Sequence, residues 1–163
     1  MKIENTYEKD NCIFFWDSIF SQWYLCTFEE DGFEYSSAEQ YMMIKKAEVF
    51  KAFDIAQEMK ETFNPRKIKA LGRSIPNFTD EEWDKHKINV VVRGNYLKFT
   101  QNKDLLKQLL STGDKEIVEA SPEDPIWGIG MYFTDKNLMN RELWGQNLLG
   151  KCLMTVRDIK GII

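Results

Sequence analysis

Two charged side chains that could act as a nucleophile and a proton carrier occur together in the largely apolar segment SSAEQYMMIKKA. Glu39 and Lys46 are seven residues apart, which in an α-helix places them about 20° from one another around the axis and about 10 Å apart along it. Two methionines and Phe50 fall on the same side of such a helix, whereas Lys45 points roughly 120° away. Helical spacing therefore pairs Glu39 with Lys46 and leaves Lys45 out.

The pattern allows two interpretations of this pair. A buried charge without a partner is costly. In the first interpretation the stem of Lys46 lies along the methionines and its amine reaches solvent. In the second, partial burial lowers the pKa of the amine and raises the pKa of the carboxyl, as in a functional site. In the second interpretation a less basic amine acts as a nucleophile near neutral pH. The carboxyl of Glu39 then moves protons beside it.

The segment SPEDPIWGIGM and the helix end LGR supply further candidates. A proline follows Asp124, which forces an extended or turn geometry at that residue. Trp127 stands beside Gly128 and Gly130, so a flat ring for stacking adjoins backbone that a ligand can approach closely. The alternative is an ordinary turn whose tryptophan fills the core. Arg73 is either an anion-binding guanidinium or a plain surface residue.

Several classes of chemistry are excluded by what the sequence lacks. The single histidine, His86, stands among charges in EEWDKHK, where we expect it to be solvated or locally paired rather than part of a catalytic triad. No phosphate-binding loop, GxGxxG or HExxH pattern occurs. The three cysteines are widely spaced without CxxC, so we expect free thiols, no disulfide and no metal site, and no cofactor is implied.

The charge and the N-terminus bear on partners and location. The net charge of −4 argues against a general electrostatic grip on nucleic acid. The N-terminus has no apolar signal-peptide core, and no window approaches the length of a membrane span. We therefore expect a cytoplasmic protein with no membrane association and no obligate protein partner.

The chain length and the expected helices and strands predict one domain, residues 1–163, that is mainly α with a small β component. These elements must position the candidate residues. A β-hairpin is expected around Asp31-Gly32, and a helix is expected to start at a Ser36–Glu39 capping box. A Thr79–Glu82 box is expected to open the longest helix. The remaining expected elements are the helices AFDIAQEMK, PRKIKALGR, NKDLLKQLLSTG and LWGQNLLGKCLMTVRDIK, the strand KEIVEA, and an ordered loop at residues 121–137.

The order of these segments resembles the NADAR family, also called YbiA-like, from about Phe14 to Arg157. The resemblance is carried jointly by FSQWYLCTFEEDGFEYSSAEQYMMIKKA, ALGR, EEWDKHK, LKFTQN, LLSTGDKEIVEASPEDPIWGIG and GQNLLGKCLMTVR. It implies a single compact YbiA-like helical domain with an N-terminal hairpin. It also implies an N-glycosidase, a hydrolase that cleaves a bond between ribose C1 and nitrogen.

Two substrate classes accompany this resemblance. One is ADP-ribose attached to guanine in DNA or nucleotides, so that the enzyme reverses ADP-ribosylation. The other is the phosphorylated ribosylamino intermediates of riboflavin biosynthesis. A non-catalytic module that binds ADP-ribose or NAD is the third hypothesis, and retention of both Glu39 and Lys46 weighs against it.

The family's functional positions fall on named residues of this chain. The resemblance makes Glu39 the acid/base, Lys46 a Schiff-base nucleophile, and Asp124 a ribose-orienting group or second acid/base; oxocarbenium-like hydrolysis is the alternative mechanism. The expected substrate contacts are Trp83, Trp127, Gly128, Gly130, Arg73, Gln22 and Asn147. Gln22 stands where the family often has asparagine, and EQYM replaces EHYF, so no imidazole adjoins Glu39.

Overall fold

The computed structural model describes residues 1–161, and the chain is divided between two compact units. Residues 25–102 form one of them, here called the helical unit. The segment 1–24 and the segment that begins at Lys103 form the other, here called the sheet unit. The predicted mainly helical fold with a small β component is confirmed.

The helical unit begins with the predicted hairpin, in which β3 (Phe28–Glu30) pairs with β4 (Phe33–Tyr35) in antiparallel register. Asp31 and Gly32 connect the two strands with φ angles of 53° and 81°, which is the left-handed conformation that a two-residue hairpin turn requires. Five helices follow: α1 (Ala38–Val49), α2 (Phe53–Lys60), α3 (Pro65–Arg73), α4 (Asp80–Asp84) and α5 (Lys87–Gln101).

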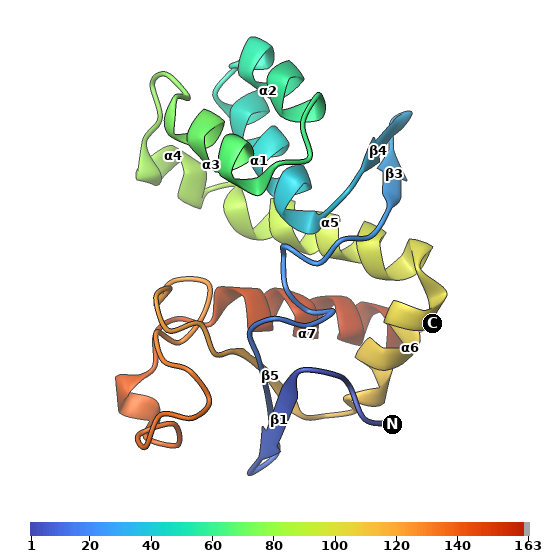
Figure 1. The fold of residues 1–163 in the computed structure, drawn as a ribbon, viewed down its shortest axis with the longest axis vertical. Coiled ribbons are helices and arrows are strands. Elements are labelled where there is room, and N and C mark those ends of the chain that lie inside the picture. The colour runs from blue at the N-terminus through green and yellow to red at the C-terminus, as the bar shows by residue number, and fades with distance from the viewer. Residues whose placement is uncertain (162–163) are drawn as a thin grey trace. The chain divides into compact units, whose positions relative to one another are not determined.

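The core of the helical unit forms around α1, which contacts α2, α3 and α5 (Figure 1). Ile44 and Ala47 on α1 are fully buried, as are Met59 of α2 and Ile68 of α3. Burying one such aliphatic side chain contributes roughly 1.5–3 kcal/mol. This packing fixes α1 against α3, the two helices that carry the candidate residues Glu39, Lys46 and Arg73.

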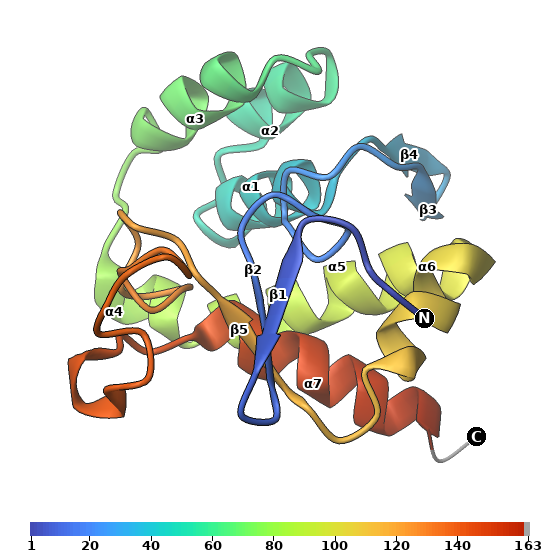
Figure 2. The ribbon, with the colours of Figure 1, turned by 60° about the horizontal axis from the view of Figure 1, so that its bottom comes forward.

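The sheet unit contains a three-stranded sheet in the order β1–β2–β5. β1 (Thr6–Lys9) pairs antiparallel with β2 (Cys12–Phe15), and β2 pairs parallel with β5 (Glu116–Glu119). Figure 2 shows the β1–β2 hairpin beside β5, and α7 (Leu148–Gly161) packs on β5. The unit also includes α6 (Lys103–Ser111) and a short 3₁₀-helix, η1 (Arg141–Leu143).

Three predicted boundaries were wrong. The N-cap of α1 is Ser37 rather than Ser36, and its Oγ accepts the backbone N–H of Gln40 at 3.0 Å. Thr79 does cap a helix, but α4 ends at Asp84. The backbone N–H groups of Lys85 and His86 bond to carbonyls three residues earlier, and α5 begins only at Lys87. The last helix starts at Leu148 rather than Leu143.

The β1–β2 hairpin was missed because its turn residues, Asp10 and Asn11, include no glycine. Both adopt positive φ angles, 50° and 61°, so an Asp-Asn pair makes the turn that Asp-Gly usually signals. Glu116–Glu119 is a strand as expected, and residues 121–137 contain neither helix nor strand, also as expected.

Candidate active site

The start of α1 is fixed by a buried amide as well as by its N-cap. Gln40 is fully buried, and its Nε2 donates to the carbonyls of Met59 and Thr62, at 3.2 Å each. Its Oε1 accepts from the backbone N–H of Ser36 at 2.9 Å. These bonds tie the first turn of α1 to the end of α2, and so they set the direction of Glu39 one residue earlier.

Glu39 and Lys46 line the same cavity, as their helical spacing predicts. This cavity has a volume of about 420 Å³ and lies entirely within the helical unit. α1 contributes Met43 besides the charged pair, and Phe78 comes from the segment before α4. From α3 come Lys69, Gly72 and Arg73.

The amine of Lys46 lies against aromatic rings. Its Nζ is 4.3 Å from the centre of the Phe78 ring and 5.8 Å from that of Trp83. Burial lowers the pKa of Lys46, and the negative charges of Glu39 and Asp80 oppose that decrease. Lys46 therefore releases its proton more readily than an ordinary lysine, which is the property a nucleophilic amine needs.

The neighbouring Lys45 has opposite surroundings. Its Nζ forms ion pairs with Glu30 at 3.4 Å and with Glu48 at 3.3 Å. Burial alone would lower the pKa of Lys45, but the charges of Tyr35, Glu48 and Glu30 outweigh it and raise the pKa. Lys45 is thus held as a cation in a structural ion-pair network, and the structure separates the two lysines as the helical spacing does.

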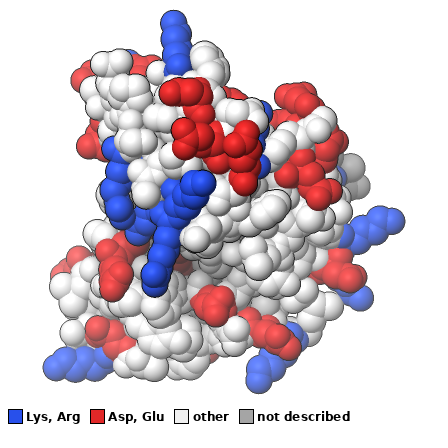
Figure 3. Space-filling model, turned by 45° about the horizontal axis from the view of Figure 1, so that its top comes forward, with Lys and Arg blue, Asp and Glu red and all other residues white. Residues whose placement is uncertain are grey.

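Arg73 and Lys69 give one side of the cavity an excess of positive charge. The two residues are four apart on α3, so they lie on the same helix face. With Lys46 they supply three cations against the single carboxylate of Glu39. Figure 3 shows lysine and arginine side chains gathered on one part of the surface, with acidic side chains beside them.

Lys69 was missed by sequence reasoning, although a signal for it exists. Lys69 lies one turn before Arg73 on the same face of α3, and this i, i+4 spacing is visible in the sequence. Gly72 has a packing role here, because a Cβ at this position would collide with the methyl group of Met43. This lack of a side chain lets α3 approach α1 at the cavity.

Trp83 forms part of the surroundings of Lys46 from a buried position. It lies in α4, and 6% of its surface is exposed. Its indole is thus mostly covered by protein, and it lies near the amine of Lys46. Its predicted contact with substrate stays a prediction.

The other candidates lie in the sheet unit, where Asp124 organises its own loop. One carboxylate oxygen of Asp124 accepts the backbone N–H groups of Ile126 and Trp127, at 2.9 Å each. This arrangement is an Asx turn, in which the side chain takes the place of a backbone acceptor. Trp127 itself is half-buried.

The glycines after Trp127 differ in their surroundings. Gly128 is buried, and a Cβ there would lie 2.7 Å from the carbonyl oxygen of Glu119. The space that its missing side chain leaves is therefore filled by protein backbone. Gly130 is exposed and has a φ angle of 77°, a conformation that glycine adopts without strain.

The amide side chain of Asn147 bonds to strand β5. Its Oδ1 accepts from the backbone N–H of Glu119, and its Nδ2 donates to the carbonyl of Ile117, both at 2.9 Å. Asn147 has 4% of its surface exposed, and Gln22 has 8%. Asn147 thus joins β5 to the start of α7, and its predicted contact with substrate stays a prediction.

The cysteines and the single histidine do not line this cavity. All three cysteines are free, and Nε2 of His86 lies 3.1 Å from a carboxylate oxygen of Glu82, so the histidine is locally paired. Among residues 1–161, no group of three His, Cys, Asp or Glu side chains is arranged to hold a metal ion. In the part of the chain that the structure describes, no helix has the length and apolar character to cross a membrane.

The chain belongs to the NADAR domain family, whose model matches residues 14–159 and so includes residues of both units. It is 49% identical over 146 residues to N-glycosidase R617 of Acanthamoeba polyphaga mimivirus, a match that covers 86% of each chain. It is also 33% identical over 135 residues to the chloroplastic riboflavin biosynthesis protein PYRR of Zea mays. That match covers 78% of this chain but only 20% of the maize protein.

The fold is similar to a solved structure. The NMR structure of the Escherichia coli protein YbiA superposes with a TM-score of 0.74, covering 98% of this chain and 90% of that one at 24% identity. The resemblance to the NADAR, or YbiA-like, family is confirmed by the family match and by this fold.

Proposed function

We propose that this protein is an N-glycosidase that hydrolyses the bond between ribose C1 and a nitrogen atom. The observation that carries the proposal is the cavity in which Glu39 and Lys46 meet, with the pKa of Lys46 lowered by burial. The mimiviral relative, which is 49% identical to this chain, is named an N-glycosidase, and this supports the same class of reaction.

The proposed reaction begins when the ammonium of Lys46 transfers a proton to the carboxylate of Glu39. The neutral Nζ attacks ribose C1, the C1–N bond breaks, and the leaving nitrogen takes the proton from Glu39. Nζ, now a secondary ammonium, gives up a proton, the bond between C1 and the ring oxygen opens, and the ring oxygen takes that proton, which leaves C1 joined to Lys46 as a protonated Schiff base. Water adds to C1, and departure of the amine releases the ribosyl product and restores both side chains.

The alternative mechanism uses the same two residues without a covalent bond. Glu39 removes a proton from water as the C1–N bond breaks through an oxocarbenium-like state. Lys46 stays a cation in this mechanism, and it stabilises the negative charge that develops on the leaving nitrogen and supplies a proton to it. Borohydride separates the two mechanisms, because it reduces a Schiff base to a stable amine that mass spectrometry locates on one lysine. A ribose adduct on Lys46 is expected; an adduct on Lys45, or none during turnover by the wild type, contradicts the covalent mechanism.

We propose ADP-ribose attached to guanine, in DNA or in a nucleotide, as the substrate. The three cations of the cavity, Lys46, Lys69 and Arg73, support a ligand that carries phosphate groups. The test incubates the protein with guanine-ADP-ribosylated DNA and measures released ADP-ribose, with Lys46→Ala as the inactive control. A folded wild-type protein that releases none contradicts this substrate.

A phosphorylated ribosylamino intermediate of riboflavin biosynthesis is the second candidate. The maize relative is named a riboflavin biosynthesis protein, which supports this candidate, and the same cations suit a 5′-phosphate. Turnover of this compound without release of ADP-ribose from DNA selects the second candidate. Binding of ADP-ribose that survives both Lys46→Ala and Glu39→Ala, with no turnover of either substrate, selects a non-catalytic binding module.

We also propose a cytoplasmic location. Free cysteines support it, because thiols persist in reducing compartments. Asp124 stays a predicted ribose-orienting group or second acid/base, and Trp127 a predicted stacking residue.

A further inference from the structure

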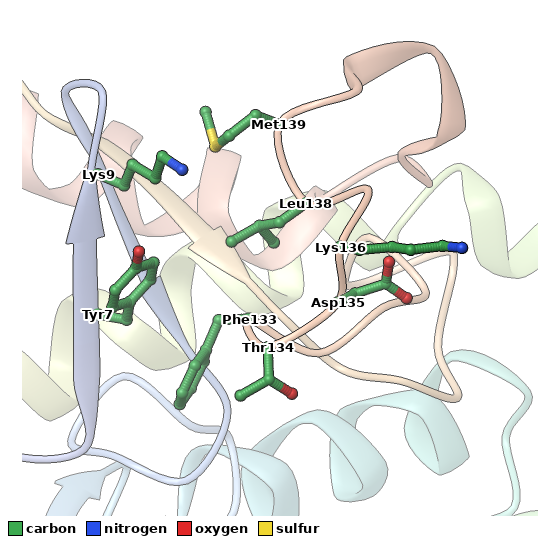
Figure 4. Close-up of a pocket in the computed structure, with 8 residues that line it drawn as sticks. All are labelled: Tyr7, Lys9, Phe133, Thr134, Asp135, Lys136, Leu138 and Met139. Atoms are coloured by element: carbon green, nitrogen blue, oxygen red, sulfur yellow. The ribbon is translucent and has the colours of Figure 1, made fainter.

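We propose that the sheet unit carries a second small-molecule site, for a mononucleotide or another planar aromatic ring with an anionic group. The site is the hollow between strand β1 and residues 133–139, and its volume is about 540 Å³. Small-molecule sites usually fall between about 300 and 1,000 Å³. Figure 4 shows its wall, which includes Tyr7, Lys9, Phe133, Leu138 and Met139. None of these residues lines the cavity of Glu39 and Lys46.

An aromatic wall determines the shape of the ligand. The rings of Tyr7 and Phe133 are stacked, with centres 5.9 Å apart and planes at 22°. Tyr7 is 40% exposed although it stands in an ordered strand. Tyr132 packs on Phe133, with ring centres 4.0 Å apart, so the exposed part of the Tyr7 ring is the surface against which another flat ring can pack.

The alternation of side chains along β1 places the cation Lys9 beside this aromatic wall. Tyr7 and Lys9 are two residues apart on β1, so their side chains leave the same face of the strand. In Figure 4 Lys9 extends from the strand toward Leu138 and Met139, whereas Lys136 extends away from the strand. Lys9 therefore supplies a positive charge beside the rings, which suits an anionic substituent on the bound ring.

Hydrogen bonds and packing within the chain hold the far wall of the hollow. Asp135 accepts the backbone N–H of Asn137 at 2.8 Å, and the indole of Trp144 donates to the carbonyl of Leu138 at 2.6 Å. Leu138 is buried in the apolar core of the sheet unit together with Phe14. The loop that forms the far wall is thus held by its own hydrogen bonds and packing, so binding requires little ordering of the chain.

The surrounding charges favour a single nucleotide over a long nucleic acid. A second hollow of about 310 Å³ adjoins the first through Phe133, and its wall includes Asp17. Asp135 lines the first hollow, and the whole chain has a net charge of −4. A polyanion that ran along both hollows would approach these carboxylates, whereas one anionic group beside Lys9 avoids them.

The test uses the full chain with ¹³C-labelled leucine and methionine methyl groups, titrated with guanosine 5′-monophosphate. Met139 and Leu138 report on the proposed site, and Met43 reports on the cavity of Glu39 and Lys46. We expect saturable shifts at Met139 and Leu138. Their apparent Kd should rise at least tenfold in Lys9→Gln and change less than twofold in the matched control Lys136→Gln.

Two further ligands test separately, on the wild-type protein, whether the ring and the anionic group are each recognised. This test does not depend on the folding of any variant. Guanosine keeps the ring without the anion, and ribose 5-phosphate keeps the anion without the ring, so each should bind at least tenfold more weakly. Shifts confined to Met43, or equal binding of guanosine and guanosine monophosphate, would overturn the proposal. These outcomes do not depend on turnover, and they leave the proposed N-glycosidase activity to its own assay.

Discussion

At the scale of single residues, two adjacent lysines of α1 have opposite electrostatic surroundings. Lys46 lies against Phe78 and Trp83 with a lowered pKa, while Lys45 is paired with Glu30 and Glu48 and has a raised pKa. The physical difference is direction around one helix, because neighbouring residues point about 100° apart. The pair therefore offers an internal control for the proposed chemistry.

We expect Lys46→Ala to lower turnover by about 100-fold or more, the lower end of what a positioned proton-transfer or nucleophilic group contributes. Lys45→Ala should keep turnover within a few-fold, since its amine is engaged with Glu30 and Glu48. Initial rates of N-glycosidic cleavage, measured with each folded variant, check both statements. Equal losses in the two variants would contradict the assignment of Lys46.

The pH dependence of turnover should report the lowered pKa of Lys46. The neutral amine is the nucleophile, so the rate should rise with pH through a pKa below the ordinary lysine value of about 10.4. Phe78→Ala exposes the amine to water, which raises its pKa and moves the rising limb to higher pH. Rate–pH profiles of wild type, Phe78→Ala and the exposed control Phe63→Ala measure this shift. An unmoved limb in Phe78→Ala would rule out aromatic burial as the cause.

For Asp124, the structure offers a substitution that keeps the turn and removes the charge. The side-chain oxygen of asparagine can also accept the N–H groups of Ile126 and Trp127. Asp124→Asn should thus fold normally but lose about 100-fold in turnover if this carboxylate is an acid/base. Thermal unfolding and initial rates are compared with those of the exposed neighbour variant, Glu123→Gln. Full activity of Asp124→Asn would leave Asp124 a role in the turn alone.

At the scale of secondary-structure elements, α1 is the helix on which the candidate site depends. Its N-cap, its buried Gln40 and its contacts with α2, α3 and α5 hold Glu39 and Lys46 over the cavity. α3 completes the cavity because Gly72 permits close approach and because Lys69 and Arg73 share one face. The site is therefore built from two helices that pack through their apolar faces.

We expect Ser37→Ala to destabilise the protein by about 1 kcal/mol, the usual effect of removing an N-cap side chain. The Ser37 Oγ accepts the N–H of Gln40, and this N–H would lose its partner. Ser36→Ala is the matched control, because the backbone N–H of Ser36 still bonds to Gln40 when its hydroxyl is gone. Urea unfolding midpoints at constant m-value measure both. A larger loss for Ser36→Ala would place the cap one residue earlier.

At the scale of the whole molecule, the local and total charges have opposite signs. The chain carries a net charge of −4, yet the candidate cavity has three cations and one carboxylate in its wall. The total charge thus argues against a general electrostatic attraction to nucleic acid, whereas the cavity favours a compact anion. Only the arrangement of α1 and α3 reveals this local excess.

The affinity for ADP-ribose should accordingly fall several-fold as the salt concentration rises. The reason is that the Debye screening length shortens to about 3 Å near 1 M salt. The double variant Lys69→Gln/Arg73→Gln should bind more weakly at low salt and lose most of the salt dependence. Isothermal titration at two ionic strengths measures both effects. A double variant with the wild-type salt slope would show that the phosphates bind elsewhere.

Much of the helical unit was predictable because its signals are local. The hairpin turn at Asp31-Gly32, the Asn64 cap of α3 and the face shared by Glu39 and Lys46 each depend on residues within two helical turns of one another. Where local signals were incomplete, boundaries shifted: the Asp10-Asn11 turn lacks glycine, and α4 separates from α5 at Lys85.

The sequence by itself predicted the β3–β4 hairpin, most of the helices and the helix face that Glu39 and Lys46 share. Tertiary structure alone decided which groups surround them. It places Lys69 in the cavity and fully buries Lys98. Burial lowers the pKa of Lys98 to about 8, and the nearby Cys26 opposes this decrease. The physical reason is that burial and electric field are set by elements distant in sequence, whereas helical phase is set within one turn.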